Sequence, residues 1–380
     1  MGDIAVILGG PSPEHDVSVL TGLQAARALS GDGAGGSRGT QVRLLYWAKT
    51  GDWLEVDPGL EGADFADGVP RGASPLRLVA APGGGFVAPG GRLGRDRVLA
   101  LDLALNCCHG GPGEDGTLQA ALDLAGVSYT GPTAAGAALG MDKLAFGAVV
   151  AGAGLPCLPR VLAEPGEELP EGWPGFGGPY IVKPRYGGSS IGIEVVEDLA
   201  TARARLDANL HLRQGAVIEP YRPDLHDVQV AVRSWPELAL SAIERPLRSS
   251  EAGEILSYAD KYVGGEGMVS APRELPADLA PELADQLRRA ARRIAALVGL
   301  RGIARLDFLS DGEALFVNEI NTVPGSLAKY LWVEPAVPFA RLLADMAEEA
   351  TRRPTVQWTT AGADGAALRS AGTIAGKLGQ

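Results

Sequence analysis

The sequence is short of cysteine, of long apolar runs and of basic residues, and each shortage excludes a class of protein. Its 380 residues include three cysteines, too few for a disulfide framework. They contain no run of about 18 apolar residues, so we expect no transmembrane helix and no membrane partner. The formal net charge of −12 argues against a nucleic-acid or lipid surface. We therefore expect a globular chain of two or three domains, located in the cytoplasm.

The amino-terminal part has the pattern of an α/β domain. Residues 4–8 are all apolar and end at Gly9-Gly10, which is typical of a buried parallel strand. Residues 17–29 follow with helical spacing. Asp3 stands where a signal peptide would carry basic residues, so we expect none. The same strand and helix pattern continues to about residue 130.

Two late segments carry the strongest chemical signal, Arg305-Leu306-Asp307-Phe308 and Asn318-Glu319-Ile320-Asn321. Residues two apart on a strand point to the same face, so Arg305 accompanies Asp307. By the same rule Glu319 accompanies Asn321. Two carboxylates and an amide oxygen are ligands that Mg²⁺ prefers, and phosphates usually supply the rest. The segments predict ATP-dependent chemistry; an ordinary half-buried hairpin with surface charges is the alternative.

Residues 310–313, Ser-Asp-Gly-Glu, are a turn signal between these segments. A two-residue turn would leave Glu319 on the opposite face from Asp307. An odd-length turn would pair Asp307 with Val317 and give the hairpin both a metal face and an apolar face; it would also pair Arg305 with Glu319. We expect the odd-length turn.

A glycine-rich loop and three lysines indicate phosphate binding. The loop 187–192 lies between two expected strands and is not a Walker A loop, but its backbone N–H groups could fold over phosphates. Lys183 precedes it, Lys143 opens an expected helix, and Lys261 stands in a Tyr-Ala-Asp-Lys-Tyr context. Lysine is a compact point charge suited to phosphate oxygens. Solvated lysines and a plain turn are the alternative.

Taken together, these segments resemble the ATP-grasp superfamily and, within it, the D-alanine–D-alanine ligases. The resemblance runs from Val6 to about Ala350. Its motifs are Gly9-Gly10, Glu14-His15-Asp16-Val17-Ser18, His109-Gly110, Gly113-Glu114-Asp115-Gly116-Thr117-Leu118-Gln119, Tyr129-Thr130-Gly131, Met141-Asp142-Lys143, Ile181-Val182-Lys183-Pro184, Gly188-Ser189-Ser190, Lys261-Tyr262, Arg305 with Asp307, Asn318-Glu319-Ile320-Asn321-Thr322 and Pro324-Gly325.

The resemblance implies an α/β, three-domain ATP-grasp fold. An N-terminal pre-ATP-grasp domain would span 1–130, a central subdomain 131–215, and a C-terminal subdomain with the metal and catalytic residues 216–353. Residues 354–380 have no usable pattern, and we expect a disordered tail. The resemblance also implies a homodimer formed through the N-terminal domain.

The implied chemistry is the ATP-dependent joining of two amino acids. The donor's carboxylate would take the γ-phosphate of ATP, and the acceptor's amine would attack the resulting acyl phosphate. The matching residues on the ATP side are Lys143, Lys183 and Lys261 for phosphate, Ser190 in the loop, Glu219 for adenine, Asp227 for ribose, and Asp307, Glu319 and Asn321 for Mg²⁺, with two ions expected and Mn²⁺ as an alternative.

On the amino-acid side, Glu14 matches the carboxylate that holds the donor's ammonium group. Ser189 and Tyr262 would hydrogen-bond with it, and Arg305 with the N–H of Gly325 would stabilise the tetrahedral oxyanion. His109 resembles a donor-site residue, with a structural histidine as the alternative. Tyr262 also favours an amine acceptor, because a phenylalanine there accompanies ester formation.

The chain departs from the family pattern after Gly325. The serine that usually holds the acceptor's carboxylate is displaced, so Ser326, Lys329 and Tyr330 are all candidates for that role. Asp227, or His226, stands where a glutamate usually binds ribose. A D-alanine–D-alanine ligase of peptidoglycan synthesis is the leading hypothesis. A ligase for another amino-acid pair is the second, and a catalytically inactive nucleotide-binding protein is the third.

Overall fold

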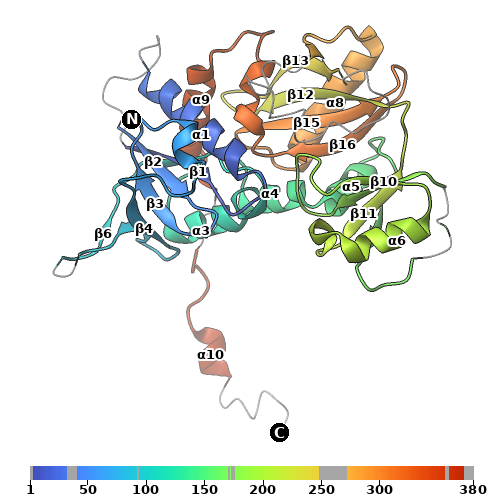
Figure 1. The fold of residues 1–380 in the computed structure, drawn as a ribbon. Coiled ribbons are helices and arrows are strands. Elements are labelled where there is room, and N and C mark those ends of the chain that lie inside the picture. Colours follow the sequence, from blue (N-terminus) through green and yellow to red (C-terminus); the bar gives the residue numbers. More distant parts are fainter. Residues whose placement is uncertain are drawn as a thin grey trace.

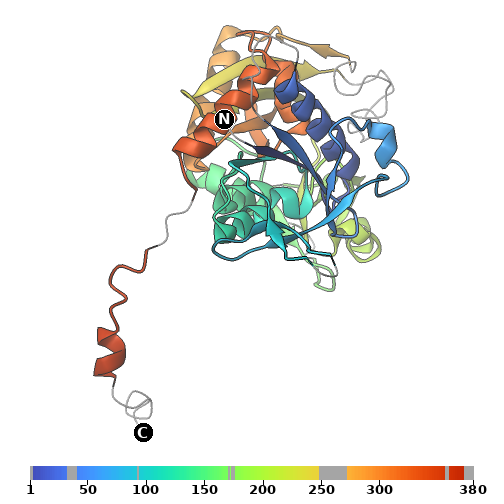
Figure 2. The same cartoon turned by 90° about the vertical axis from the view of Figure 1, so that its left-hand side faces the viewer.

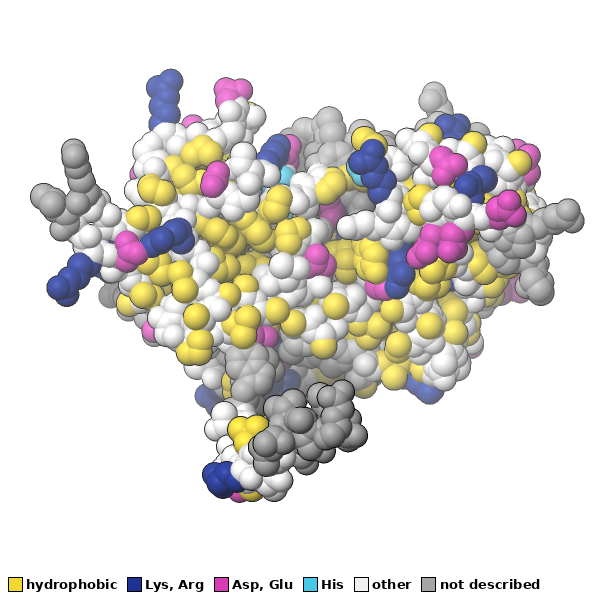
Figure 3. Space-filling view, turned by 90° about the horizontal axis from the view of Figure 1, so that it is seen from below, with side chains coloured by type: hydrophobic (Ala, Val, Ile, Leu, Met, Phe, Trp, Pro, Cys, Tyr) yellow, Lys and Arg dark blue, Asp and Glu magenta, His cyan; other side chains and the backbone are white. Residues whose placement is uncertain are grey.

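A computed structural model describes residues 3–31, 41–91, 94–169, 172, 176–247, 272–355 and 359–371. Three sheets follow one another along the chain. Figure 1 shows the first sheet at left, the third at upper right and the second below the third, and Figure 2 shows the same molecule turned by 90°. Within the described residues no single helix combines the length and apolar content needed to cross a membrane. The helices Ala134–Met141 and Lys143–Gly152 reach both only when taken together, and they are bent by 96°. On the face in Figure 3, the described Lys and Arg side chains are scattered rather than gathered.

The first sheet has seven strands in the order β6-β5-β4-β3-β2-β1-β7. They are β1 Ile4–Gly9, β2 Val42–Trp47, β3 Trp53–Val56, β4 Ser74–Val79, β5 Gly85–Ala88, β6 Arg97–Val98 and β7 Leu103–Asn106. The expected parallel core strand is confirmed, because β1 lies between β2 and β7 and is parallel to both. The helices of this part are α1 His15–Ser30, η1 Gly62–Phe65, α2 Gly111–Glu114 and α3 Thr117–Ala125.

The second sheet has four antiparallel strands in the order β10-β9-β11-β8. They are β8 Val161–Ala163, β9 Tyr180–Pro184, β10 Glu194–Val196 and β11 Ala216–Pro220. The helices α4 Ala134–Met141 and α5 Lys143–Gly152 precede the sheet, and α6 Leu199–Ala208 and η2 Leu210–Leu212 follow β10. The division expected after residue 215 would separate β11 from this sheet, whereas its pairing with β9 keeps it there.

The third sheet has five strands in the order β14-β13-β12-β15-β16. They are β12 His226–Arg233, β13 Ala239–Pro246, β14 Arg273–Glu274, β15 Ile303–Ser310 and β16 Leu315–Asn321. One face packs on α8 Pro281–Leu297, whose buried Leu287, Ala291 and Ile294 lie on one stripe of the helix. The chain continues through η4 Gly325–Leu331 to α9 Phe339–Arg352. Within the described tail, α10 Ala366–Ser370 has no buried residue and projects from the body (Figure 1).

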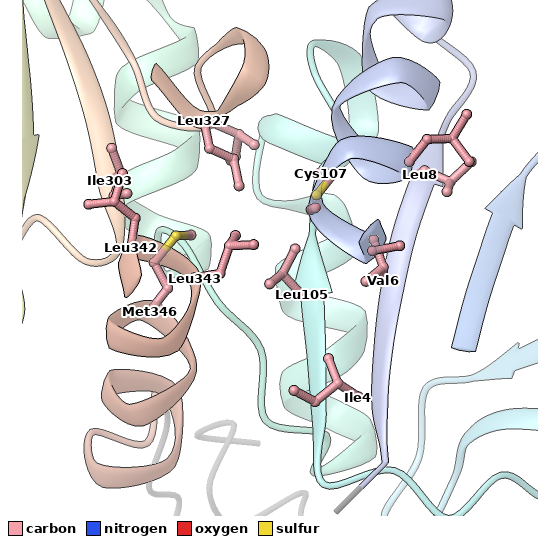
Figure 4. Packing of buried hydrophobic residues seen from close by; sticks show 14 of the residues in the cluster. Ile4, Val6, Leu8, Leu105, Cys107, Ile303, Leu327, Leu342, Leu343 and Met346 are labelled. Carbon is pink, nitrogen blue, oxygen red and sulfur yellow. The ribbon is translucent and has the colours of Figure 1, made fainter. Parts of the chain in front are cut away.

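The N-terminal sheet shares one hydrophobic core with η4 and α9. Val6 and Leu105, from β1 and β7, belong to the same buried cluster as Leu343 and Met346 of α9 (Figure 4). Leu327 of η4 lies in that cluster as well. The segment that follows the β15–β16 hairpin is therefore packed against the first part of the chain and not only against its own sheet.

The hairpin β15–β16 differs from the predicted register. Asp307 pairs with Glu319, Arg305 with Asn321, and Phe308 with Val317, with the register shifting between Asp307 and Phe308. The odd-length turn was therefore wrong: four residues, 311–314, separate the paired Ser310 and Leu315. A bulge at Asn318 supplies the extra residue and keeps Glu319 on the same face as Asp307.

Candidate active site

A cavity lies between the second and third sheets and collects most of the predicted ATP-side residues. Its lining includes Lys143, Lys183, Ser190, Glu219, Asp227, Asp307 and Glu319. A smaller cavity beside it is lined by Glu14, Lys143, Glu319 and Asn321 together. A third, of ≈ 690 Å³, also has Glu14 and Gly188 in its lining. Residues from distant parts of the chain thus meet in one region.

The predicted metal ligands form a compact group of oxygen donors. Asp307 and Glu319 are directly paired across β15 and β16, so their carboxylates share a face. Arg305 donates to both carboxylate oxygens of Asp307, from Nε and Nη2 at 2.7 Å each. Asn321 Nδ2 donates to Asp307 Oδ2 at 3.0 Å. Among the described residues no cluster has three His, Cys, Asp or Glu side chains, but two carboxylates plus an amide oxygen remain a suitable donor set for Mg²⁺.

The bulge at Asn318 is held by residues from outside the hairpin. Arg160 donates from Nη2 to the carbonyl oxygen of Asn318, and Lys183 Nζ lies 3.3 Å from Asn318 Oδ1. The N–H of Val317 donates to Pro156 at 2.8 Å. Two of these contacts use backbone groups of the bulged strand and one uses the Asn318 side chain, and together they stabilise the register that brings Glu319 opposite Asp307.

Lys143 is placed by the start of helix α5. Asp142 caps the helix, accepting from the N–H groups of Leu144 and Ala145, and Arg185 pairs with the same carboxylate at 2.6 Å. Lys143 Nζ donates to the carbonyl oxygen of Gly187 and lies 3.6 Å from Glu319 Oε2. The ammonium group therefore connects the glycine-rich loop with the face of the hairpin that carries Glu319.

Lys183 and Glu219 form a buried charged group with Arg160. Lys183 Nζ donates to Glu219 Oε2 at 2.8 Å, and Arg160 Nε lies 2.9 Å from Oε1. Burial alone would raise the pKa of Glu219, but the charges of Lys183 and Arg160 outweigh it and lower the pKa. Glu219 was predicted to read adenine, yet both carboxylate oxygens bind these two cations. We interpret Glu219 as the residue that orients Lys183, and the adenine contact stays a prediction for its backbone.

Glu14 meets the glycine-rich loop as expected. Ser189 Oγ donates to Glu14 Oε1, and both side chains are at least nine-tenths buried. Ser189 and Ser190 have φ of 52° and 59°, a left-handed conformation that favours glycine and is strained for serine. A Cβ on Gly110 would lie 2.4 Å from Glu14 Oε2 and one on Gly188 would lie 2.9 Å from it. The carboxylate is therefore enclosed by two backbones that only glycine allows so near.

The segment 322–326 is held by three buried side chains from the N-terminal part. Glu114 Oε1 accepts from the N–H of Val323 at 2.8 Å, and Oε2 accepts from the N–H of Gly110 at 2.9 Å. His109 Nδ1 lies 2.6 Å from the carbonyl oxygen of Val323, so this nitrogen carries the proton. His109 Nε2 then accepts from Thr21 Oγ1 at 2.8 Å, and Thr21 accepts from the N–H of Ser326 at 3.0 Å.

This arrangement favours the structural alternative for His109, and its donor-site role stays a prediction. Both of its ring nitrogens have protein partners, so the imidazole has no nitrogen left for a substrate atom. Burial lowers its pKa to about 4, which keeps the ring neutral. Burial and the nearby charge of Glu14 raise the pKa of Glu114 to about 7. The side chains of Glu114 and Thr21 were not predicted to act here, although Glu114 lies within a motif that carried the resemblance.

The three candidates for the acceptor's carboxylate have different surroundings. Lys329 Nζ lies 4.9 Å from the ring centre of Phe339, and burial lowers its pKa. The N–H of Ser326 is taken by Thr21, and residues 326–328 all have φ near 50°. Tyr330 Oη alone adjoins Arg305, at 3.4 Å from Nη1. Lys261 and Tyr262 lie outside the described residues.

Comparisons with known proteins agree along most of the chain. Residues 3–132 match the family model for the D-ala D-ala ligase N-terminus, and residues 168–348 the model for the C-terminus. A D-alanine–D-alanine ligase of Bradyrhizobium sp. strain ORS 278 is 30% identical, covering 92% of this chain and 95% of the relative. One from Mycolicibacterium smegmatis is 31% identical, covering 93% and 96%.

Solved structures agree in fold. The D-alanine–D-alanine ligase of Coxiella burnetii superposes with a TM-score of 0.74 at 22% identity, covering 92% of this chain and 94% of that one. The VanG D-Ala:D-Ser ligase of Enterococcus faecalis gives 0.69 at 22% identity, covering 92% and 99%. These likenesses show the shared ATP-grasp fold. Since the sequence relatives reach 30% identity or more over at least 92% of its length, this chain belongs to the D-alanine–D-alanine ligase family, a family of ADP-forming carbon–nitrogen ligases.

Proposed function

We propose that this chain joins two D-alanine molecules with consumption of ATP, the product serving peptidoglycan precursor synthesis, as the names of its relatives suggest. One observation carries the proposal. A single small cavity is lined by Glu14, Lys143, Glu319 and Asn321. It offers a carboxylate for an ammonium group, a cation for a phosphate or carboxylate, and oxygen ligands for a metal, which are the requirements of carboxylate activation on an amino acid.

The family uses ATP and a divalent metal, and the residues of this chain fit both. When bound, ATP supplies the phosphoryl group that activates the donor's carboxylate, and the metal neutralises triphosphate charge. Asp307, Glu319 and Asn321 would hold Mg²⁺, two ions being our proposal and Mn²⁺ an alternative. Lys143 and Lys183 line the cavity as point charges for phosphate oxygens. Lys183 is oriented by Glu219 before any ligand arrives.

The donor amino acid would bind through its ammonium group to Glu14. Ser189 already donates to one oxygen of that carboxylate and fixes its orientation. The other oxygen faces Gly110 and Gly188, which exclude side chains from the space beside it. The donor's carboxylate would then point toward Lys143 in the same cavity. Holding the reacting group in one orientation supplies much of the rate.

Attack by the acceptor's amine puts negative charge on the former carboxylate oxygen, and fixed donors must meet it. Arg305 is suited to this role because Asp307 binds its Nε and Nη2 and leaves Nη1 directed toward Tyr330. The N–H of Gly325 would be the second donor. Its neighbours Val323 and Ser326 are both held by N-terminal side chains, which fixes the backbone on each side.

Tyr330 would bind the acceptor's carboxylate. Its oxygen lies next to Arg305 Nη1, so a carboxylate there would meet a hydroxyl and a guanidinium together. Burial raises the pKa of Tyr330, so the hydroxyl keeps its proton and remains a donor. Lys329 is directed at Phe339 instead.

Product analysis tests the proposal. Purified protein, ATP, Mg²⁺ and D-alanine should give ADP, phosphate and D-alanyl-D-alanine by mass spectrometry, whereas L-alanine should give none. A second candidate keeps the chemistry and changes the acceptor, and Tyr330 at the acceptor position favours it. Phosphate release with a mixed D-amino-acid pool but without D-alanyl-D-alanine would select this second candidate. No ADP with any amino acid would refute both.

The assembly and location of the protein remain proposals. We propose a homodimer that binds small-molecule amino acids and ATP, in the cytoplasm. Sedimentation of the purified chain at micromolar concentration measures the first, and a monomer at every concentration would contradict it.

A further inference from the structure

Two ion pairs join the same two strands, β13 and β14, on opposite faces of the third sheet. Glu244 Oε1 lies 2.9 Å from Arg273 Nη1, and Arg245 Nη1 lies 3.0 Å from Glu274 Oε2. The side chains of Glu244 and Arg273 are 4% and 14% exposed, whereas those of Arg245 and Glu274 are 30% and 38% exposed. Because neighbouring residues on a strand alternate in direction, the two pairs point to opposite faces, and the pair of Glu244 and Arg273 is the more buried of the two.

The register places that buried pair on the face of the active site. Glu244 is directly paired with Gln229, and Gln229 with Asp307. Directly paired residues point to the same side of a sheet, so Glu244 lies in one row with Asp307 and Glu319. Neither Glu244 nor Arg273 was identified from the sequence as part of a site.

Arg273 connects this row to the proposed acceptor residue. Its Cζ lies 5.0 Å from the ring centre of Tyr330, a distance at which a cation is attracted to an aromatic face. The hydroxyl of the same ring accepts from Arg305. Tyr330 is thus held at its face by one guanidinium and at its oxygen by another. The contacts run without a break from Glu244 through Arg273, Tyr330 and Arg305 to Asp307.

A buried ion pair is a weak source of stability, because desolvation offsets much of the attraction between its charges. Stability alone therefore does not explain why this pair is buried. Burial raises the pKa of Glu244, and the charge of Arg273 opposes that rise. The carboxylate fixes the guanidinium, and the planar guanidinium fixes the ring. Among the described residues, the oxygen of the ring has one hydrogen bond, which is long at 3.4 Å.

We propose that Arg273, held by Glu244, is a positioning residue that orients Tyr330 and thereby sets the enzyme's affinity for the acceptor amino acid. The proposal rests on the proposed function, in which Tyr330 binds the acceptor's carboxylate. Neither residue lines the cavities of Glu14 and Lys143, so we expect donor and ATP binding to change much less than acceptor binding when this pair is broken.

Two acceptors separate this role from a general structural one. D-alanine carries a carboxylate, whereas hydroxylamine does not: its nitrogen attacks the activated acyl carbon, phosphate leaves, and a hydroxamate forms. The variant Arg273→Ala should raise the acceptor's KM at least about 10-fold while hydroxamate formation from D-alanine stays within about two-fold of wild type. Arg273→Lys should lie between, because it keeps the charge and loses the planar stacking. Arg245→Ala, which breaks the matched pair on the other face, should change neither reaction.

A double-mutant cycle completes the test. If Arg273 acts through Tyr330, then Arg273→Ala should change the acceptor's KM by less than about two-fold in the Tyr330→Phe background. Additive effects would overturn the proposal, and so would an equal loss of dipeptide and hydroxamate in both Arg273 variants. Failure of the wild type to form hydroxamate or ADP with any amino acid is a different result: it refutes the proposed function, and this inference with it.

Discussion

His109 and Glu114 bind the two backbone polar groups of the same residue, Val323. The carboxylate of Glu114 accepts from its N–H at 2.8 Å, and Nδ1 of His109 donates to its carbonyl oxygen at 2.6 Å. Val323 lies two residues before Gly325, the proposed oxyanion donor. We therefore expect His109 and Glu114 to contribute to catalysis without touching substrate, by fixing a backbone segment that the third sheet alone does not hold.

Thr21 should be needed for this arrangement. Thr21→Val keeps the shape but removes the hydroxyl that joins the N–H of Ser326 to His109. Displacement of the Gly325 backbone should lower kcat by roughly 10- to 100-fold with little change in the donor's KM. Thr21→Ser retains the hydroxyl and should keep near-normal activity. Equal kcat for the Val and Ser variants in an ADP-release assay would refute the role.

The two buried groups should respond to pH in opposite directions. The folded pKa of His109, about 4, lies below its ordinary 6.5, so its contribution to stability is complete above pH 6.5 and is lost as pH falls toward 4. The folded pKa of Glu114, about 7, lies above its ordinary 4.5, so its contribution is complete below pH 4.5 and is lost as pH rises toward 7. Between about pH 4.5 and pH 6.5, the free energy of unfolding therefore rises with pH through His109 and falls with pH through Glu114.

Replacing the imidazole should expose the slope of His109. The free energy of unfolding of wild type minus that of His109→Gln should rise by about 3 kcal/mol between pH 4 and pH 6.5. Urea unfolding at a series of pH values measures this difference. A difference that is constant with pH would show that the ring is not held neutral by burial.

Glu319 should be indispensable for turnover. Glu319→Gln removes one of the two carboxylates that face each other across β15 and β16, and we expect at least about a 100-fold loss of ADP release. Glu313→Gln changes the same group at the exposed tip of the same hairpin and should have no effect. Activity of Glu319→Gln close to that of Glu313→Gln would remove Glu319 from the metal site.

Substitution of Gly110 should weaken donor binding specifically. Gly110→Ala would put a Cβ 2.4 Å from Glu14 Oε2 and displace that carboxylate. We expect the donor's KM to rise at least about 10-fold while the KM for ATP stays within about two-fold. Gly126→Ala is the matched control, because its φ of 72° imposes similar strain but its Cβ meets nothing within 4 Å. Equal effects of both variants would attribute the loss to strain alone.

The predicted common face of Asp307 and Glu319 is confirmed, but the predicted register was wrong, and the observed register needs a bulge to keep the two residues on one face. The alternation of a strand predicts which neighbours share a face, and that part is confirmed. The bulge at Asn318 could not be predicted, because Arg160, Lys183 and Pro156 hold it from more than one hundred positions away. Local spacing carries no information about such remote contacts.

The residues of the site also divide into those that the sequence could predict and those that it could not. Residues with chemistry of their own, such as Glu14, Lys143 and Lys183, could be found from motifs, and the structure gathers them. Residues that act by holding others could not. Arg160 and Arg273 have unremarkable neighbours in the sequence, and their roles follow only from the groups that tertiary packing brings to them.

The core that joins β1 and β7 to α9 has a consequence for synthesis of the chain. Val6 and Leu105 leave the ribosome long before Leu343 and Met346, yet all four bury their side chains in one cluster. Part of the apolar face of the first sheet therefore stays exposed to solvent until α9 has been translated. The strands that are synthesised first are therefore among the last to complete their packing.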